Sequence, residues 1–131
     1  MKKILFVCAE NAGRSQIAEA FANHYGGGKI IASSAGTMPA RMVNPLVVEV
    51  MREKGIDISH NEPKLLNTQM IQDADMVIVM GCSVGASCPA PLLSKVVDWG
   101  LEDPKGKPIE KIREIRDEIG RRVRKLVDET I

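Results

Sequence analysis

The sequence predicts an α/β fold in which a parallel sheet of four strands is covered by helices on both faces. Short apolar runs alternate along the chain with segments of helical periodicity, which is the pattern of successive βαβ units. The runs at residues 4–7 and 76–80 are apolar at every position, as expected for strands that are buried on both faces. The length of 131 residues, of which 44% are hydrophobic, suits one compact domain spanning residues 1–131.

The first part of the chain is predicted to run strand, helix, strand. Residues 3–7 form the first strand, and residues 15–25 have helical periodicity. The glycines at residues 26–28 end this helix because glycine tolerates the positive φ of a helix C-terminus. Residues 29–33 form the second strand, and residues 34–37 form the loop after it.

Two helices are predicted next, separated by a polar and irregular segment at residues 56–66. Asn44 and Pro45 begin the first of them, because proline is favoured in the first turn of a helix, and Gly55 ends it. Asn67 is a candidate N-cap for the second, short helix, which reaches residue 72.

The last part of the chain contains two more strands and a long helix. Residues 76–80 and 94–97 form the third and fourth strands, and a loop rich in glycine, proline and serine occupies residues 81–91. A further loop at residues 99–104 leads to an amphipathic helix at residues 109–129. The predicted inward face of that helix consists of Ile112, Ile115, Ile119, Val123 and Leu126.

The loops that follow the four strands all carry chemically distinctive side chains. Right-handed crossovers bring the loops after parallel strands to one edge of the sheet, which is where such sheets bind ligands. These loops contain Cys8, Ser34, Cys82 and Asp103, respectively. We therefore expect a functional site at that edge.

The segment between the first strand and the first helix predicts an anion-binding loop with a nucleophile. Several backbone N–H groups and the helix dipole point at one spot in such a loop, and the fork of Arg14 matches two oxygens of an oxyanion. The same field favours the thiolate of Cys8, to which Ser15 can donate a hydrogen bond. The alternative is a buried structural cysteine that an arginine happens to follow. The predicted binding residues are Cys8, Ala9, Glu10, Asn11, Ala12, Gly13, Arg14 and Ser15.

Cys82 and Cys88 form a second candidate group after the third strand. In an unbroken helix they would lie about 9 Å apart along the axis, farther than the roughly 4.4–6.8 Å between Cα atoms that a disulfide requires. The glycines and prolines around them favour a looped segment that permits the bond. The pair then serves in a relay, in which Cys82 attacks Cys8 and Cys88 resolves the resulting disulfide. Packing of the loop is a second interpretation.

A zinc site is a third interpretation of this cysteine pair. A structural zinc site has four ligands, and neither His24 nor His60 has the spacing of a ligand. We therefore expect no metal.

Asp103, in the run Glu102-Asp103-Pro104, is a candidate general acid. A positioned acid assists a reaction on an oxyanion that expels an oxygen leaving group. The alternative is a purely structural turn, because Asp-Pro is common in turns.

Composition excludes several classes of partner. A net charge of +1 gives no electrostatic reason to expect nucleic acid or an anionic membrane surface. No apolar run approaches the about 18 residues of a spanning helix, and Glu10 and Arg14 interrupt the apolar N-terminus too early for a signal peptide. We expect a cytoplasmic protein whose three cysteines are catalytic, redox-active or metal-binding rather than a disulfide framework.

Several of these segments together resemble the low-molecular-weight protein tyrosine phosphatase superfamily. They are the loop from Cys8 to Ser15, Ser34-Ala35-Gly36 after the second strand, and Asp103-Pro104 late in the chain. The pair Cys82 and Cys88 and the run from Trp99 to Pro104 resemble its branch of thioredoxin-coupled arsenate reductases. The resemblance covers essentially the whole chain and implies a four-stranded parallel sheet with flanking helices.

The resemblance implies a role for each residue that meets the substrate. Cys8 is the nucleophile on arsenate, Arg14 and the loop amides bind the oxyanion, and Ser15 tunes the thiolate. Asn11 orders the loop with help from Ser34, and these two assignments also rest on the resemblance. Asp103 protonates the departing oxygen.

The resemblance also implies how the reaction is completed. Cys82 attacks the arsenic-bearing Cys8 and releases arsenite, and Cys88 takes the disulfide onward. Thioredoxin or a similar dithiol then reduces the Cys82–Cys88 bond, without any cofactor.

The chain departs from the pattern of these reductases at two places. Five residues separate Cys82 from Cys88, one fewer than the family pattern has, so the relay loop closes differently. Some relatives bind potassium beside the oxyanion loop through an aspartate, where this chain has Lys64. We therefore expect no potassium site, with the charge of Lys64 as the substitute.

Two alternative functions remain open. A tyrosine phosphatase acting through a phosphocysteine needs Cys8, Arg14 and Asp103, together with aromatic walls for the substrate ring. Trp99 is the only aromatic residue near Asp103 in the sequence, so we expect weak activity on small aryl phosphates. A non-catalytic module that binds trivalent metalloids or metals through the three thiols would leave the anion loop without a purpose.

Overall fold

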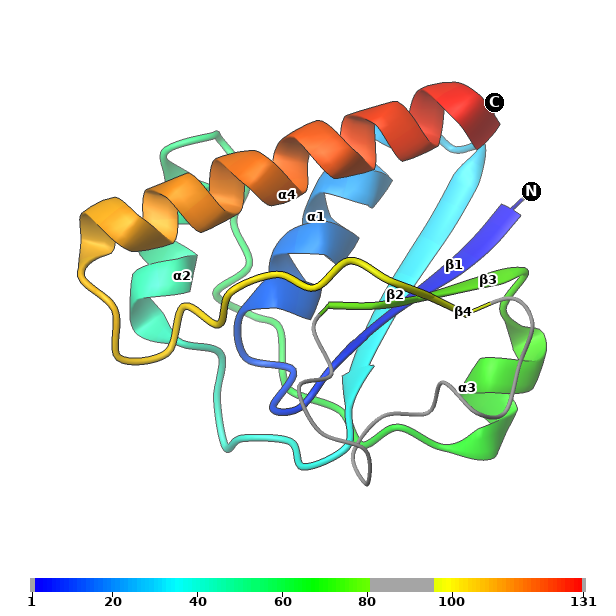
Figure 1. The fold of residues 1–131 in the computed structure, drawn as a ribbon, viewed down its shortest axis with the longest axis horizontal. Coiled ribbons are helices and arrows are strands. Elements are labelled where there is room, and N and C mark those ends of the chain that lie inside the picture. The colour runs from blue at the N-terminus through cyan, green and yellow to red at the C-terminus, as the bar shows by residue number, and fades with distance from the viewer. Residues whose placement is uncertain (1, 81–95, 131) are drawn as a thin grey trace.

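The structure is a computed structural model that describes residues 2–80 and 96–130. Within these residues the strands form one parallel sheet with the order β2-β1-β3-β4 (Figure 1). The predicted fold class is therefore confirmed. The strands are β1 (Lys2–Cys8), β2 (Ile30–Gly36), β3 (Met76–Val79) and β4 (Val96–Asp98).

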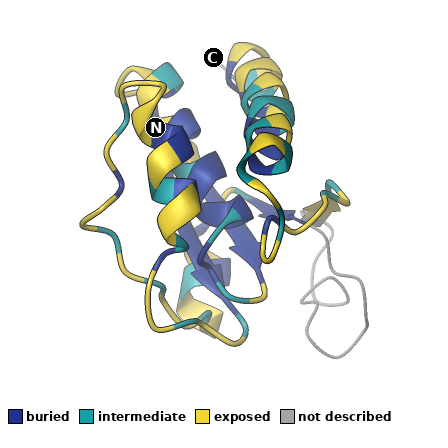
Figure 2. Cartoon of the chain, turned by 90° about the vertical axis from the view of Figure 1, so that its left-hand side faces the viewer, coloured by how far each residue is buried: buried dark blue, intermediate teal, exposed yellow. Residues whose placement is uncertain are grey.

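Helices cover both faces of this sheet, as the continuously apolar strands predict. The long helix α4 and its neighbours α1 and α2 lie on one face, and α3 lies on the other (Figure 1). The inner faces of the helices and the sheet are buried, while the outer faces of the helices are exposed (Figure 2). The helices are α1 (Arg14–Gly26), α2 (Pro45–Arg52), α3 (Thr68–Asp73) and α4 (Ile109–Thr130).

Strand β1 shows why its sequence is apolar at every position. Ile4 and Phe6 point into the larger core cluster, which α1, α2 and α4 complete, and Leu5 and Val7 point into the smaller cluster beside α3. Successive side chains of a strand face opposite sides, so a strand covered on both sides needs apolar residues throughout. Each of these four side chains is at most 2% exposed.

The predicted helix boundaries are confirmed by cap geometry. The side chain of Asn44 accepts a hydrogen bond from the backbone N–H of Leu46, and Pro45 is the first residue of α2. Asn67 accepts from the backbone N–H of Met70 at the start of α3. Gly27 ends α1 in the left-handed conformation with a φ of 57°.

The differences between prediction and structure include the bounds of two strands and one core position. The second strand continues through Gly36 instead of ending at residue 33, because Ser34, Ala35 and Gly36 pair in parallel register with β1. Pairing with a central strand thus overrides the turn preference of serine and glycine. The last strand ends at Asp98 instead of residue 97, and its predicted start at residue 94 lies outside the described residues. In α4, Val127 is buried where Leu126 was expected, and Leu126 is half-buried.

The strand order places Cys8 at the point where the chain changes direction across the sheet. From β1 the chain moves to β2 on one side, and then returns past β1 to β3 on the other. Ligands of open parallel sheets bind at the carboxyl ends of the strands at such a switch point. Cys8 is the last residue of β1, so it lies in this position.

Candidate active site

The loop after Cys8 is held in a tight arch by backbone contacts. Asn11 has a φ of 52°, a left-handed conformation that asparagine tolerates better than most residues. The carbonyl groups of Ala9, Glu10 and Ala12 accept hydrogen bonds from the segment between β2 and α2, at 2.8–2.9 Å. The loop also passes close to Gly36, where a Cβ atom would lie 2.5 Å from the carbonyl oxygen of Ala9. The absence of a side chain at Gly36 thus lets the loop close.

Two donors point at the sulfur of Cys8, which is 5% exposed. The backbone N–H of Asn11 donates to Sγ at 3.3 Å, and the hydroxyl oxygen of Ser15 lies 2.9 Å from Sγ. Since that oxygen already accepts a hydrogen bond from Asn11 Nδ2 at 2.7 Å, its own hydrogen is available to the sulfur. Both groups would stabilise negative charge on Sγ, as a nucleophilic thiolate requires.

Asn11 is the centre of a buried network that fixes this geometry. Its Nδ2 donates to Ser15 and to Ser34, at 2.7 and 3.0 Å. Its Oδ1 accepts from Gln16 Nε2 at 3.2 Å and from the backbone N–H of Lys64 at 2.8 Å. The amide therefore uses both donors and both acceptor positions, and the residue is fully buried. The predicted pairing of Asn11 with Ser34 is present in the structure.

The network continues outward from Ser34 to a pair of charges. Ser34 Oγ donates to Glu19 Oε1 at 2.7 Å, and Lys64 Nζ lies 3.7 Å from the same oxygen. The ammonium of Lys64 therefore compensates the carboxylate that closes the network. The charge therefore lies next to the network of Asn11, and its role as a substitute for potassium stays a prediction.

Arg14 begins α1 and connects it to the ends of two other strands. Its Nη1 donates to the carbonyl oxygen of Met80, just after β3, at 3.1 Å. It also donates to the carbonyl oxygen of Leu101, after β4, at 2.9 Å. The side chain is 9% exposed, so its guanidinium is held in a fixed orientation.

Asp103 approaches the same guanidinium from the loop before α4. Its Oδ2 lies 3.6 Å from Arg14 Nη2, and its Oδ1 accepts from the backbone N–H of Lys105 at 3.0 Å. The structural turn and the position near the site are therefore both present. The carboxylate is 53% exposed, so it is accessible to solvent.

These groups converge on a small cavity of about 40 Å³. It lies beside Cys8 and Arg14, and we refer to it as the oxyanion cavity. Its lining residues include no aromatic side chain among those the structure describes. They are Cys8, Glu10, Ala12, Gly13, Arg14, Asn44, Asp103, Pro104 and Lys105.

Some predicted residues lie elsewhere. Cys82 and Cys88 lie outside the residues that the structure describes. Trp99, the one aromatic residue expected near Asp103, packs on Phe6 with ring centroids 6.0 Å apart and does not line the oxyanion cavity. The loop residue Ala9 is exposed and is likewise absent from the lining.

Sequence reasoning missed three residues that support the site. Gln16 donates to Asn11, Glu19 accepts from Ser34, and Lys105 lines the oxyanion cavity. Gln16 and Glu19 are three residues apart and therefore share one face of α1, next to Ser15. A polar stripe beside an otherwise buried helix face was the available signal. Lys105 gave no signal, because only the fold brings its loop to residue 10.

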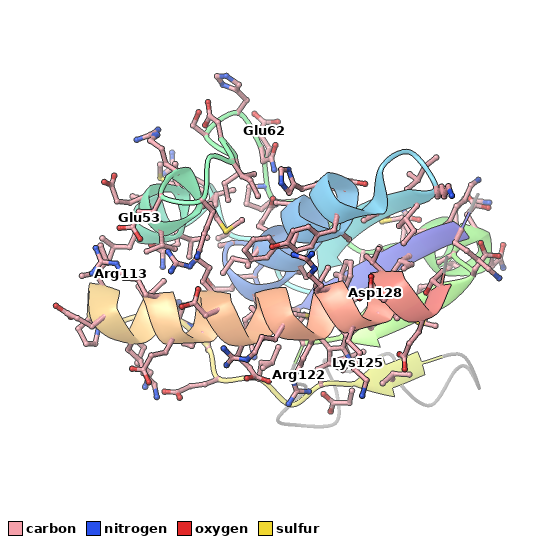
Figure 3. All side chains as sticks on the ribbon, turned by 90° about the horizontal axis from the view of Figure 1, so that it is seen from above. Glu53, Glu62, Arg113, Arg122, Lys125 and Asp128 are labelled. Atoms are coloured by element: carbon pink, nitrogen blue, oxygen red, sulfur yellow. The ribbon has the colours of Figure 1, made fainter. Side chains whose placement is uncertain are left out.

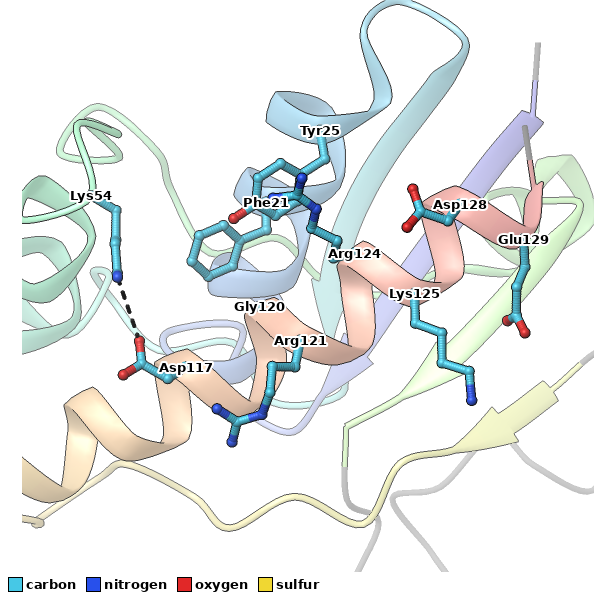
Figure 4. A pocket seen from close by; sticks show the side chains of 10 residues that line it. All are labelled: Phe21, Tyr25, Lys54, Asp117, Gly120, Arg121, Arg124, Lys125, Asp128 and Glu129. Carbon is cyan, nitrogen blue, oxygen red and sulfur yellow. Dashed lines mark ion pairs between the residues drawn. The ribbon is translucent and has the colours of Figure 1, made fainter.

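Other features of the described residues do not compete with this site. A larger cavity, about 730 Å³, is a wide groove between α1 and α4, and Figure 4 shows the Lys54–Asp117 ion pair at one end of it. The described residues contain no group of three histidine, cysteine, aspartate or glutamate side chains placed to hold a metal ion. Nor does any helix within them have the length and apolarity needed to cross a membrane.

Comparison with known proteins gives a consistent result along the whole chain. The family profile described as low molecular weight phosphotyrosine protein phosphatase matches residues 3–131. A glutaredoxin arsenate reductase of Synechocystis is 39% identical over 129 residues, which cover 97% of this chain and 97% of the relative.

Solved structures point the same way. An arsenate reductase in the phosphate binding state has a TM-score of 0.85 and 38% identity, with 98% of both chains covered. A thioredoxin-dependent arsenate reductase of Corynebacterium glutamicum has a TM-score of 0.79 and 39% identity, and the match covers 98% of this chain and 60% of that one.

Proposed function

Because this chain belongs to the low molecular weight phosphotyrosine protein phosphatase family, we propose that it uses the Cys8 loop to reduce arsenate through a three-cysteine relay. Within the family the chain is an arsenate reductase, since relatives of that activity match it over nearly its full length. The relay, the roles of single residues and the electron donor are the proposed part.

In the first step, the Cys8 thiolate attacks arsenic in the oxyanion cavity. The backbone N–H groups of the loop and Arg14 bind the arsenate oxygens, which places the arsenic next to Sγ. Asp103 gives a proton to the departing oxygen, which leaves as water. The product carries a bond between Sγ of Cys8 and arsenic(V).

In the second step, Cys82 supplies the electrons. Its thiolate attacks Sγ of Cys8, the sulfur–arsenic bond breaks, and its electron pair stays on arsenic, which leaves as arsenite. Cys88 then attacks Cys82, forms the Cys82–Cys88 disulfide and releases the Cys8 thiolate. The two thiols consumed balance the two electrons gained by arsenic.

Thioredoxin or a similar dithiol protein is the proposed donor that reduces the Cys82–Cys88 bond. A thioredoxin-dependent reductase supports this choice, and the glutaredoxin reductase of Synechocystis shows that relatives differ in donor. Such a cycle needs a reducing compartment, so we place the protein in the cytoplasm.

The observation that carries the proposal is the convergence of Cys8, Arg14 and Asp103 on one small cavity. The nucleophile, an anion-binding fork and a candidate acid line a space of about 40 Å³, although they come from positions 8, 14 and 103 of the chain. A structural cysteine would not need the other two groups beside it.

A single turnover tests the relay. Fully reduced, oxygen-free protein is mixed with arsenate without external reductant, and then free thiols, arsenite and disulfides are measured. We expect the loss of two thiols, about one arsenite per chain and a Cys82–Cys88 bond. Three intact thiols without arsenite would refute the relay and favour a phosphatase.

Two substitutions separate the roles of the cysteines. Cys88→Ser should release one arsenite per molecule and stop at a Cys8–Cys82 disulfide, whereas Cys8→Ser should release none. Normal steady-state turnover of Cys88→Ser with thioredoxin would show that the three-cysteine relay is wrong. A module that only binds metalloids would release no arsenite from any of these proteins.

Phosphatase activity is the second candidate, because the family profile is that of a phosphatase and Cys8, Arg14 and Asp103 also suit phosphoester hydrolysis. Trp99 is packed on Phe6, so it is not placed to hold a substrate ring. We expect slow hydrolysis of p-nitrophenyl phosphate and poor use of phosphotyrosine peptides. Turnover of a phosphopeptide as fast as that of arsenate would contradict this expectation.

A further inference from the structure

An ion pair joins two loops at the solvent side of the oxyanion cavity. Glu10 lies in the loop after β1, Lys105 lies in the loop before α4, and Lys105 Nζ donates to Glu10 Oε2 at 2.6 Å. Both residues line the cavity together with Cys8. Cys8 is 5% exposed, whereas the side chains of Glu10 and Lys105 are 36% and 67% exposed, so the pair forms the outer rim.

The same two loops also meet at a second place. A Cβ atom on Gly13 would lie 2.7 Å from Cγ of Pro104, so the loops are in tight contact there, and Pro104 is buried. Asp103 accepts from the backbone N–H of Lys105, and this turn holds the lysine beside the cavity. The cavity is thus bordered by a fixed contact at Gly13 and a polar, openable contact at Glu10.

The charges of the rim are balanced only while both partners are present. The hydrogen bond to Glu10 raises the pKa of Lys105, and the negative charge of Asp103 makes a smaller contribution in the same direction. Without Lys105, the carboxylate of Glu10 would repel an entering oxyanion. Without Glu10, the ammonium would attract any anion, whatever its size.

We propose that the Glu10–Lys105 pair is a strap that restricts the site to unsubstituted inorganic oxyanions and disfavours their esters. The cavity beneath the strap measures only about 40 Å³, which leaves no room for an organic substituent. An ester carries an organic group on one of its oxygens. In the bound ester this group has to project out of the cavity through the rim, so the strap must open. The proposal rests on the proposed function for the identity of the preferred ligand.

Binding of inorganic phosphate and phenyl phosphate tests the strap without turnover. Both ligands are titrated calorimetrically into Cys8→Ser protein, alone and with Glu10→Ala or Lys105→Ala added. Because an exposed ion pair accounts for only a few-fold change in an equilibrium constant, the ratio of the Kd of phenyl phosphate to that of phosphate should fall roughly threefold to fivefold in each variant. Combining both substitutions should lower it no further, since either one opens the strap.

A matched control removes a different lysine from an ion pair. Lys54 lies 3.9 Å from Asp117 in the groove between α1 and α4, away from the oxyanion cavity. Lys54→Ala should leave the Kd ratio unchanged, and a change as large as that of Lys105→Ala would overturn the proposal.

The opposite result is equally clear. If Lys105 acts only as an attractive charge, Lys105→Ala weakens both ligands alike, Glu10→Ala strengthens both alike, and the ratio stays constant. A constant ratio in both variants overturns the strap.

The experiment also separates the strap from the proposed function. A shifted ratio in the Cys8→Ser background, together with no arsenite from a single turnover of the unmodified protein, would support the strap and refute arsenate reduction. An unchanged ratio in that background, together with arsenite release by the unmodified protein, would refute the strap alone.

Discussion

Asn11 makes four hydrogen bonds through its side chain and has an unusual backbone conformation. The four side-chain bonds reach Ser15, Ser34, Gln16 and the backbone of Lys64. Its φ of 52° turns the loop so that its own N–H faces the sulfur of Cys8. A single residue therefore sets both the curvature of the loop and the orientation of the Ser15 hydroxyl.

Asn11→Ala should therefore damage both stability and activity. The change leaves buried polar partners unsatisfied, at about 1–3 kcal/mol for each group that finds no other partner. It also places alanine in a left-handed conformation, at a further cost of roughly 1 kcal/mol. We expect a decrease of about 3 kcal/mol in the free energy of unfolding, measured by urea denaturation, and a large loss of arsenite release in a single turnover.

Asn11→Gly is the matched variant that isolates the side chain. Glycine adopts the same φ without strain, so only the hydrogen bonds are lost. We expect most of the activity loss to remain and part of the stability loss to disappear. Full activity of Asn11→Gly would show that the network around the amide is dispensable.

Lys64 leads to a prediction about monovalent cations. Its ammonium lies 3.7 Å from the Glu19 oxygen that also accepts from Ser34, so a positive charge is already part of the network. Exchanging potassium for sodium at constant ionic strength should therefore leave the rate of arsenate reduction unchanged. A strong stimulation by potassium in the unmodified protein would contradict this role of Lys64.

At the scale of elements, helices α2 and α4 are joined by a carboxylate shared between two arginines. Arg113 Nη2 donates to Glu53 Oε2 at 2.8 Å, and the buried Arg116 donates to Oε1 at 2.7 Å (Figure 3 shows Glu53 beside Arg113). Hydrogen bonds from Arg113 and then from Arg116 lower the pKa of Glu53 from 4.5 to about 2. Arg116 also donates to the carbonyl oxygen of Val50, so the contact holds the end of α2 against α4.

The lowered pKa gives this contact a defined pH dependence. Because the folded pKa lies below the unfolded one, the pair stabilises the fold above about pH 4.5 and loses that effect as the pH falls toward 2. Glu53→Gln should therefore lower the midpoint of urea unfolding at pH 7 and have a smaller effect near pH 2.5. Glu62→Gln, at an exposed position, serves as the control and should change neither midpoint.

Strand β2 lies at one edge of the sheet, and an asparagine of α1 occupies part of that edge. Asn23 Nδ2 donates to the carbonyl oxygen of Ala32 at 3.1 Å, and Asn23 Oδ1 accepts from the N–H of Ala32 at 2.9 Å. The side-chain amide thus takes the place of a neighbouring strand. Exposed edges are templates for association between chains, so this contact blocks part of that surface.

Removing this amide should weaken the fold and expose the edge. We expect Asn23→Ala to lower the free energy of unfolding by about 1–2 kcal/mol, since one donor and one acceptor of Ala32 lose their partner. Light scattering on heating should start earlier than in the unmodified protein. Asn23→Asp keeps the acceptor, so its scattering should start between that of the unmodified protein and that of Asn23→Ala. Scattering that starts as early as for Asn23→Ala would show that the donor alone matters.

At the scale of the whole molecule, local patterns predicted the order of the elements and the core of the site. Apolar runs, two capping asparagines and the glycines after α1 are local features, and the structure confirms them. The end of β2 was wrong because Ser34, Ala35 and Gly36 owe their extended form to β1, which is distant in sequence. Lys105 was missed for the same reason, since its partner Glu10 is 95 positions away.

Two hydrogen bonds from Arg14 to backbone carbonyl groups, which we call its clamp, have a consequence for how the protein folds. The carbonyl oxygens that hold this arginine, on Met80 and Leu101, lie 66 and 87 positions further along the chain. Contacts of such long sequence separation form late, because closing a long loop costs entropy before the contact repays it. The arginine therefore becomes oriented only after β3 and β4 have joined the half of the sheet made by β1 and β2.

Competence to bind an oxyanion is then a late event on the folding pathway. In stopped-flow refolding, helical circular dichroism should recover before inorganic phosphate binds, and binding should appear with the slowest phase. A nascent chain that ends before residue 101 would contain Cys8 and its loop, yet it would lack the carbonyl that completes the clamp. If Cys8 is the nucleophile, as proposed, it would then meet a bound oxyanion only after the chain has been synthesised past residue 101.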